Sequence, residues 1–185
     1  MPASHRPTIS GGYLRGRKLE VPPGRTTRPT RSLVRQALFN MITAHIEDAR
    51  VLDLYSGSGA LGLEALSRGA ASVLFVENHR AALAALRKNV DACDLAAGEA
   101  TIMAIDARRL ETTGREQYTL VHADPPFVRT DALPPSLEQP GTLAEDALLV
   151  WHAPSERPPP VQLEGWVLDR SRTHGRSAIH LYQRA

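Results

Sequence analysis

The sequence predicts an α/β fold built on a doubly wound, mainly parallel sheet. Three observations support this prediction: strand and helix signals alternate over residues 51–151, a glycine-rich turn follows the first strand of this region, and strands follow one another near the end of the chain. Strands separated by helices are typical of a parallel sheet, because the helix returns the chain to the same edge. We therefore expect parallel strands first and antiparallel C-terminal strands after them.

The predicted elements follow in order along the chain. Short apolar runs predict five parallel strands, at 51–54, 72–77, 100–105, 118–123 and 147–151. Apolar residues at helical spacing predict helices over 60–68 and 80–91, with Gly69 ending the first of them. Pro158–Pro160 predicts a stiff connector, and two antiparallel strands are expected after it, at 165–171 and 177–182.

The residues before the first strand predict a small N-terminal hairpin extension. Residues 8–12 and 17–21 have strand character, and Pro22–Gly24 breaks the chain after them. Ser32 is then expected to cap a helix that runs through Ile46 and buries Leu33. We therefore divide the chain into an extension over 1–30 and a main domain over 31–185.

The composition excludes several classes of protein. The single cysteine, Cys93, excludes an internal disulfide framework and fits a reducing compartment. No apolar run approaches the ~18 residues that a membrane span needs, and the first residues lack the apolar segment of a signal peptide. We expect a cytoplasmic, monomeric protein without membrane contact.

Charge is unevenly distributed along the chain. Residues 1–36 hold eight basic side chains and one acidic one, residues 170–185 hold four arginines and no acid, and the region between them is acidic. Basic ends on an acidic body indicate contact with a polyanion such as RNA; an ordinary solvated face is the alternative. The candidate RNA-binding residues are Arg6, Arg15, Arg17, Lys18, Arg25, Arg28 and Arg31.

The turn after the first strand has the spacing of a nucleotide-binding loop. Gly57, Gly59 and Gly62 form a G-x-G-x-x-G pattern, and Glu77 follows Gly57 by 20 residues, after the second strand. Such a pattern is typical of dinucleotide sites, in which the acid accepts hydrogen bonds from ribose hydroxyls. A plain tight turn explains the glycines equally well.

Acidic residues at successive strand ends favour a cationic ligand over a dinucleotide. Asp53, Glu77 and Asp106 belong to the ends of three predicted strands, and ligands of such sheets lie beyond the carboxyl ends. A pyrophosphate would be repelled by these acids, whereas the sulfonium and ammonium groups of S-adenosylmethionine would be attracted. Asp106 is suitably placed for the adenine amino group, although it could equally be a helix cap.

The fourth predicted strand ends in the sequence D-P-P-F. Asp124 and the carbonyl of Pro125 are two acceptors that could hold one exocyclic amino group of a nucleobase, while Pro125 and Pro126 fix the backbone. Phe127 offers a flat face on which an extruded base could stack. The motif therefore indicates methyl transfer to a base amino group, and an ordinary loop is the alternative.

The sequence resembles the bacterial 16S rRNA guanine-N2 methyltransferases. The resemblance is carried by residues 9–42, which include the particular TRPT–LFN segment, by residues 51–77, by ADPPF at 123–127 and by the closing stretch RSRTHGRSAIHLYQR. It implies a Rossmann-like class I methyltransferase that uses S-adenosylmethionine on 16S rRNA or a small-subunit assembly particle. Residues 133–141 depart from the family pattern.

The resemblance also assigns roles to individual residues. Asp53, Ser56, Gly57 and Gly59 fall on the cofactor loop, Glu77 on the ribose and Asp106 on the adenine, while Asp124, Pro125, Pro126 and Phe127 fall on the target base. No metal is expected. An adenine-N6 methyltransferase, a nicotinamide-dependent oxidoreductase and a non-catalytic RNA-binding assembly factor remain as alternatives.

Overall fold

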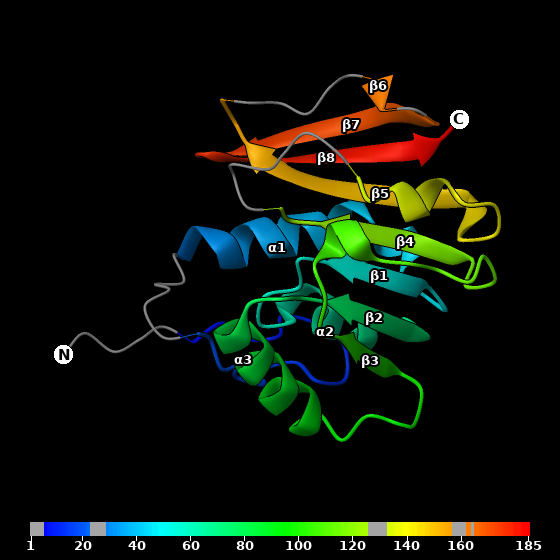
Figure 1. Cartoon of the computed structure of the whole chain (residues 1–185). Coiled ribbons are helices and arrows are strands. Elements are labelled where there is room, and N and C mark those ends of the chain that lie inside the picture. Colours follow the sequence, from blue (N-terminus) through cyan, green and yellow to red (C-terminus); the bar gives the residue numbers. More distant parts are fainter. Residues whose placement is uncertain (1–5, 23–28, 126–132, 157–161, 164) are drawn as a thin grey trace.

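The computed structural model describes residues 6–22, 29–125, 133–156, 162–163 and 165–185 and contains one eight-stranded sheet (Figure 1). The strand order is β3-β2-β1-β4-β5-β8-β7-β6. The strands are β1 (Arg50–Leu54), β2 (Ser72–Val76), β3 (Ala100–Met103), β4 (Tyr118–Ala123), β5 (Leu143–Pro154), β6 (Gln162–Leu163), β7 (Trp166–His174) and β8 (Ser177–Arg184). The strands β1 to β5 pair in parallel, and β8, β7 and β6 add antiparallel pairs. The predicted fold class is confirmed.

The strand β5 is much longer than the predicted 147–151. It pairs with β4 up to Trp151 and with β8 from Leu148 to Pro154, so its length depends on two neighbours that are distant in sequence. Both faces of the parallel strands are buried, with Val150 on one side and Leu149 and Trp151 on the other. The sheet is therefore the centre of two hydrophobic clusters.

The helices are α1 (Pro29–Met41), α2 (Ala60–Ser67) and α3 (Arg80–Asp91), with short 3-10 helices at η1 (Thr43–His45), η2 (Ala107–Arg109) and η3 (Pro135–Glu138). Buried residues of all three α-helices join one cluster, whereas η2 and η3 contribute to the opposite one. Within the described ranges, no helix combines the length and apolar character needed to cross a bilayer.

The helix predicted from Ser32 to Ile46 has different bounds. It begins at Pro29, whose fixed φ suits the first helical position, so Ser32 is inside the helix and is no cap. The helix ends at Met41, and the chain continues through η1 before Ile46. Leu33 was predicted to be buried but is 66% exposed.

The N-terminal residues pack against the main domain. Ile9, Leu14 and Leu19 are buried in the same cluster as α1 and α2. The predicted hairpin forms as a loop with one isolated bridge, between Thr8 and Lys18, instead of two strands. Residues 6–22 are therefore anchored to the domain and do not form a free arm.

A buried carboxylate anchors this N-terminal loop. Glu64 of α2 has no exposed surface, and it accepts hydrogen bonds from the backbone N–H (2.8 Å) and hydroxyl (2.7 Å) of Ser10. Arg68 Nε lies 2.8 Å and Arg35 Nε 3.4 Å from its two oxygens, and Arg35 also donates to the carbonyl of Thr8. Burial lowers the pKa of Arg35, and the charge of Glu64 opposes this effect. The loop, α1 and α2 thus meet at one charged cluster.

Candidate active site

Four predicted site residues lie in a row along one edge of the sheet. Asp106, Glu77, Gly57 and Asp124 follow β3, β2, β1 and β4, which are adjacent in that order. The parallel register brings the carboxyl ends of these strands to the same edge, where their arrowheads point in Figure 1. We call this the carboxyl edge. As predicted, these four residues follow strands that end at the same edge of the sheet.

The loop after β1 turns sharply before α2 begins. Tyr55, Gly57 and Gly59 have φ values of 59°, 61° and 78°, in the left-handed region, and Gly59 is the N-cap of α2. A Cβ on Gly59 would lie 2.4 Å from Leu86 Cδ1, so a side chain there would displace Leu86 in addition to straining the positive φ. Among the described residues, a Cβ on Gly57 would meet only the carbonyl oxygen of Tyr55, at 4.0 Å. Gly57 is thus the glycine whose backbone borders open space.

Glu77 connects the β1 loop to the end of β2. Its Oε2 accepts a hydrogen bond from the N–H of Gly57 (2.8 Å), and its Oε1 accepts from those of Asn78 and His79 (2.8 Å each). The side chain is half-buried. These bonds hold the carboxylate beside the open space at Gly57, where a ligand with donor groups would meet it.

Asp53 lies deeper than predicted. Only 1% of it is exposed; Oδ2 accepts from the N–H of Gly62 (3.2 Å), and Oδ1 lies 2.9 Å from His122 Nδ1. Because it is buried, Asp53 supports the start of α2 from within the core and does not present its carboxylate at the carboxyl edge as predicted. Its charge is therefore a weaker ground for excluding a pyrophosphate.

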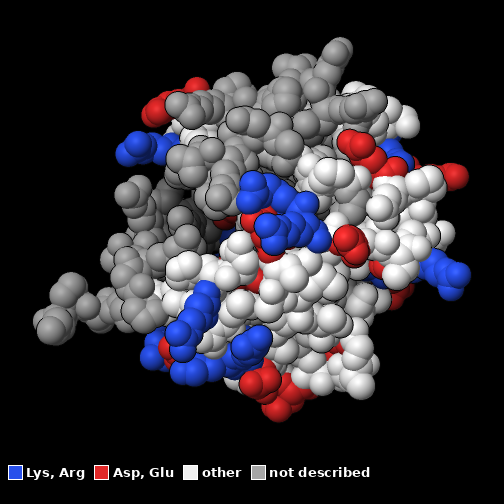
Figure 2. Space-filling view, viewed as in Figure 1, with Lys and Arg blue, Asp and Glu red and all other residues white. Residues whose placement is uncertain are grey.

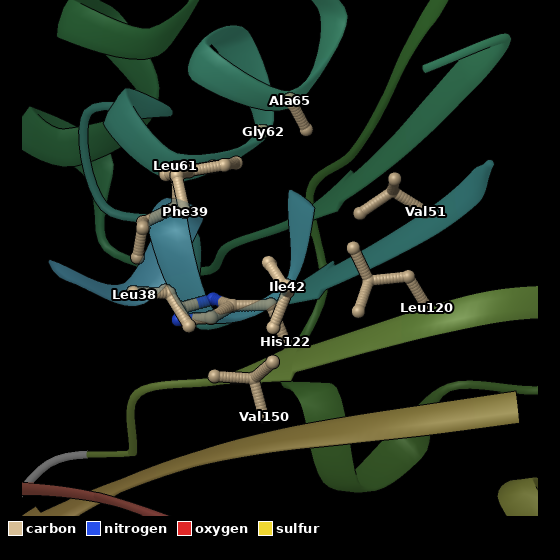
Figure 3. A pocket seen from close by; sticks show the side chains of 10 residues that line it. All are labelled: Leu38, Phe39, Ile42, Val51, Leu61, Gly62, Ala65, Leu120, His122 and Val150. Atoms are coloured by element: carbon tan, nitrogen blue, oxygen red, sulfur yellow. The ribbon is translucent and has the colours of Figure 1, made fainter. Parts of the chain in front are cut away.

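His122 is a functional-site neighbour that sequence reasoning missed. It stands opposite Asp53 in the parallel register of β1 and β4. Since a carboxylate only accepts, Nδ1 donates the hydrogen of this bond, and Nε2 is buried without a partner among the described residues. The ring lies beside Leu38 and Ile42 in a small apolar pocket (Figure 3) and contacts His152 edge to face, with centroids 4.8 Å apart. One signal existed in the sequence: a polar residue within an apolar strand.

Asn89 of α3 ties the N-terminal loop to the β1 loop. Its amide nitrogen donates to the carbonyls of Ser58 (2.8 Å) and Glu20 (3.0 Å), and its oxygen accepts from the N–H of Glu20 (2.8 Å). The residue is 3% exposed. Sequence reasoning missed it because its partners are 31 and 69 residues away.

Asp106 and Ser56 already have protein partners. Asp106 caps η2 by accepting from the N–H of Arg108 (3.0 Å) and forms an ion pair with the Arg108 guanidinium (2.6 Å). The hydrogen bond and charge of Asp106 raise the pKa of Arg108. The hydroxyl of Ser56 donates to the carbonyl of Asp53 (2.6 Å), which stabilises the turn. The alternative role of Asp106 as a helix cap is therefore real, whatever else it binds.

Asp124 is exposed at the end of β4, next to β1. Its N–H lies 3.5 Å from the carbonyl oxygen of Leu54, and Pro125 after it is buried. Pro126 and Phe127 lie outside the described residues. The structure thus describes the carboxylate of the D-P-P-F motif and the first proline. Among the described residues, no three His, Cys, Asp or Glu side chains are grouped as metal ligands would be.

The predicted RNA-binding residues are spread over several places. Tyr13 N–H bonds to the carbonyl of Ser67, at the far end of α2 from the carboxyl edge, and Arg17 acts electrostatically on Cys93 just beyond α3. Arg15 and Arg17 therefore lie toward the opposite edge, whereas Lys18 pairs with Thr8 in the isolated bridge. Figure 2 likewise shows lysines and arginines in separate groups beside acidic side chains.

The remaining predicted RNA-binding residues are near the start of the chain and α1. Arg6 forms an exposed ion pair with Glu20 (2.7 Å). Arg31 belongs to α1, and Arg25 and Arg28 lie outside the described residues.

Comparison with known proteins establishes the family. A model of the family described as Conserved hypothetical protein 95 matches residues 8–183. The chain belongs to this family. Ribosomal RNA small subunit methyltransferase D of Escherichia coli K12 is 40% identical over 178 residues, which are 95% of this chain and 89% of that relative. The enzyme of the same name from Haemophilus influenzae is 31% identical over 95% of this chain and 92% of the relative.

A solved structure of the same kind shares the whole fold. The protein described as "Putative methyltransferase yhhF" from Escherichia coli superposes with a TM-score of 0.79 at 38% identity, covering 97% of this chain and 98% of that one. The resemblance inferred from sequence motifs is confirmed, and the chain is a member of a Rossmann-like methyltransferase family.

Proposed function

We propose that the protein transfers a methyl group from S-adenosylmethionine to the exocyclic N2 amino group of a guanine in 16S rRNA. The observation that carries this proposal is the row along the carboxyl edge: a held carboxylate at Glu77, an open backbone at Gly57 and an exposed carboxylate at Asp124 on the neighbouring strand. The family and the names of its relatives support methylation of small-subunit rRNA.

The residues at the ends of β1, β2 and β3 fit the cofactor. Gly57 has free space where a Cβ would be, and Glu77 is fixed beside it by three backbone donors. In the proposal, Glu77 accepts from the ribose hydroxyls, and Asp106 accepts from the adenine amine. When bound, S-adenosylmethionine supplies a methyl group activated by a sulfonium. Asp53 and Ser56 act indirectly, by fixing the loop.

Asp124 and the Pro125 carbonyl hold the acceptor nitrogen in this mechanism. The lone pair of an exocyclic amine is delocalised into the base, so the nitrogen must be oriented and its developing positive charge stabilised. Asp124 is on the strand next to the cofactor loop and has an exposed carboxylate. It accepts from one N–H and the Pro125 carbonyl from the other. After transfer, the nitrogen releases its extra proton to water. Pro126 is proposed to stiffen the segment and Phe127 to stack on the base.

Gly57→Ala is expected to weaken S-adenosylmethionine binding at least about tenfold, because the methyl group enters the space beside Glu77. Gly98→Ala is the matched control: its φ is also positive (91°), nothing lies near its Cβ position, and it precedes β3 at the opposite edge. Both variants introduce the same kind of backbone strain, of about 1–2 kcal/mol. Calorimetric titration should show reduced affinity in Gly57→Ala alone; equal affinities would contradict the placement.

A transfer assay tests the proposed function itself. The protein is incubated with methyl-labelled S-adenosylmethionine and either naked 16S rRNA or partly assembled small subunits. Label in the RNA is expected, and its absence from both substrates would favour a non-catalytic binder. Titration with a nicotinamide dinucleotide, which should give no heat of binding, distinguishes the oxidoreductase alternative.

A further inference from the structure

The β7–β8 hairpin projects beyond the end of β4. Ala123, the last residue of β4, is level with Trp151 of β5, and Trp151 pairs with His180 of β8. Pairing continues for three more residues, to Pro154 opposite Ser177. At about 3.3 Å per residue, the hairpin extends ~10 Å past Ala123 on the carboxyl edge. We call residues 172–177 the hairpin tip.

The hairpin tip is also close to Asp124 across the sheet. In the order β4-β5-β8-β7, two strand spacings separate β4 from β8 and three separate it from β7. At about 4.8 Å per spacing, the lateral separation is ~10 to 14 Å. The tip is on the side of Asp124 away from β1 and β2, whose ends form the proposed cofactor site. A polynucleotide whose base reaches Asp124 would therefore approach the tip if it continues away from the proposed cofactor site.

Two arginines of the hairpin tip have no acidic partner among the described residues. Arg172 and Arg176 are both exposed. Arg172 makes only a hydrogen bond to the carbonyl of Ser171, and the backbone carbonyl of Arg176 accepts from Ser155. Arg170, by contrast, has Asp169 at 4.0 Å. Glu156, which follows the end of β5 opposite the hairpin tip, is exposed and forms no ion pair within the described residues.

We propose that Arg172 and Arg176 bind phosphates of the RNA strand that flanks the methylated nucleotide. This inference rests on the proposed function. It assigns an RNA contact to a part of the protein separate from the basic N-terminal residues, of which Arg15 and Arg17 lie toward the other edge. Exposed guanidinium groups without acidic partners suit phosphate oxygens. Each offers two parallel N–H donors, and no existing ion pair has to be broken for the phosphate to bind. The tip thus positions RNA and takes no part in the chemistry.

The test compares two double variants of equal charge. Arg172→Ala/Arg176→Ala removes both tip arginines, and Arg115→Ala/Arg184→Ala removes two that lie at the opposite edge, before β4 and at the end of β8. Affinity for a fluorescent 16S rRNA fragment that the wild-type protein methylates is measured between roughly 50 and 200 mM salt, over which phosphate contacts weaken strongly. Methyl-transfer kinetics are recorded on the same RNA.

The tip variant is expected to bind about tenfold more weakly near 0.1 M salt and to lose about two units of the salt slope, one for each phosphate contact. Its KM for RNA should rise, whereas kcat at saturating RNA and the affinity for S-adenosylmethionine stay unchanged. Arg172→Lys/Arg176→Lys should restore most of the binding. The inference is overturned if the tip and control variants bind alike, or if the lysine variant binds no better than the alanine variant. Absence of methylation by the wild-type protein would instead contradict the proposed function.

Discussion

Replacing Asp124 with alanine is expected to lower kcat for methyl transfer at least about 100-fold and to leave S-adenosylmethionine affinity within about twofold. The loss follows from its proposed role as an oriented acceptor for the amino group. In other enzymes, removal of one oxyanion-hole hydrogen-bond partner lowers kcat by a similar factor. Cofactor affinity should survive because the groups proposed to bind it follow other strands. Single-turnover kinetics and calorimetry measure the two quantities.

The structure makes this substitution a clean test. Asp124 is exposed, and its carboxylate forms no hydrogen bond or ion pair with a described residue, so its removal should not destabilise the fold. Asp124→Asn keeps one acceptor oxygen and should retain more activity than the alanine variant. Asp146→Ala, at an exposed position of β5, is the matched surface control and should be fully active. Normal transfer by Asp124→Ala would show that the carboxylate does not hold the acceptor.

Replacing Glu64 with alanine is expected to destabilise the protein by about 3–5 kcal/mol, because Arg35 would be left buried without its counter-ion. The backbone N–H and hydroxyl of Ser10 would lose their acceptor as well. In a chain of this size, such a change lowers the unfolding midpoint by roughly 10 °C. Urea unfolding and a thermal scan measure the effect.

A control variant distinguishes the loss of the buried cluster from the loss of any single negative charge. Glu47→Ala removes an exposed acid that forms no ion pair within the described part of the chain, and its stability should stay within about 0.5 kcal/mol of wild type. Hydrogen exchange in Glu64→Ala should also become faster at the amides of Ser10 and Leu14, because the N-terminal loop is no longer anchored. A stable Glu64→Ala protein with unchanged exchange would refute the assigned role of this cluster.

Elements defined by local pattern could be predicted from the sequence. The bounds of α3 (Arg80–Asp91) match the predicted 80–91, because its apolar spacing and the residues at its ends are local signals. The full length of β5 could not be predicted, because it depends on pairing with β8. The start of α1 at Pro29 was missed because serine is a favoured cap residue and Ser32 was preferred, although a proline suits the first helical position.

The candidate site was predictable to the extent that topology determines it. Glu77, Asp106 and Asp124 follow three of the four parallel strands β3, β2, β1 and β4, so a rule about strand ends was sufficient to bring them to one edge. Asp53 is one residue before the end of β1 and points into the core, where His122 meets it from β4. The contacts of Asn89 and Glu64 also escaped prediction, because they join segments 69 and 54 residues apart. Such polar pairs are specified only by the folded chain.

Identification of the methylated nucleoside tests the central claim most directly. Small-subunit RNA treated with the protein and S-adenosylmethionine carrying a deuterated methyl group would be digested to nucleosides and analysed by mass spectrometry. The account predicts the label in N2-methylguanosine at a single position, and its loss with Asp124→Ala. Label in N6-methyladenosine, or in a base methylated on a ring nitrogen or carbon, would contradict it.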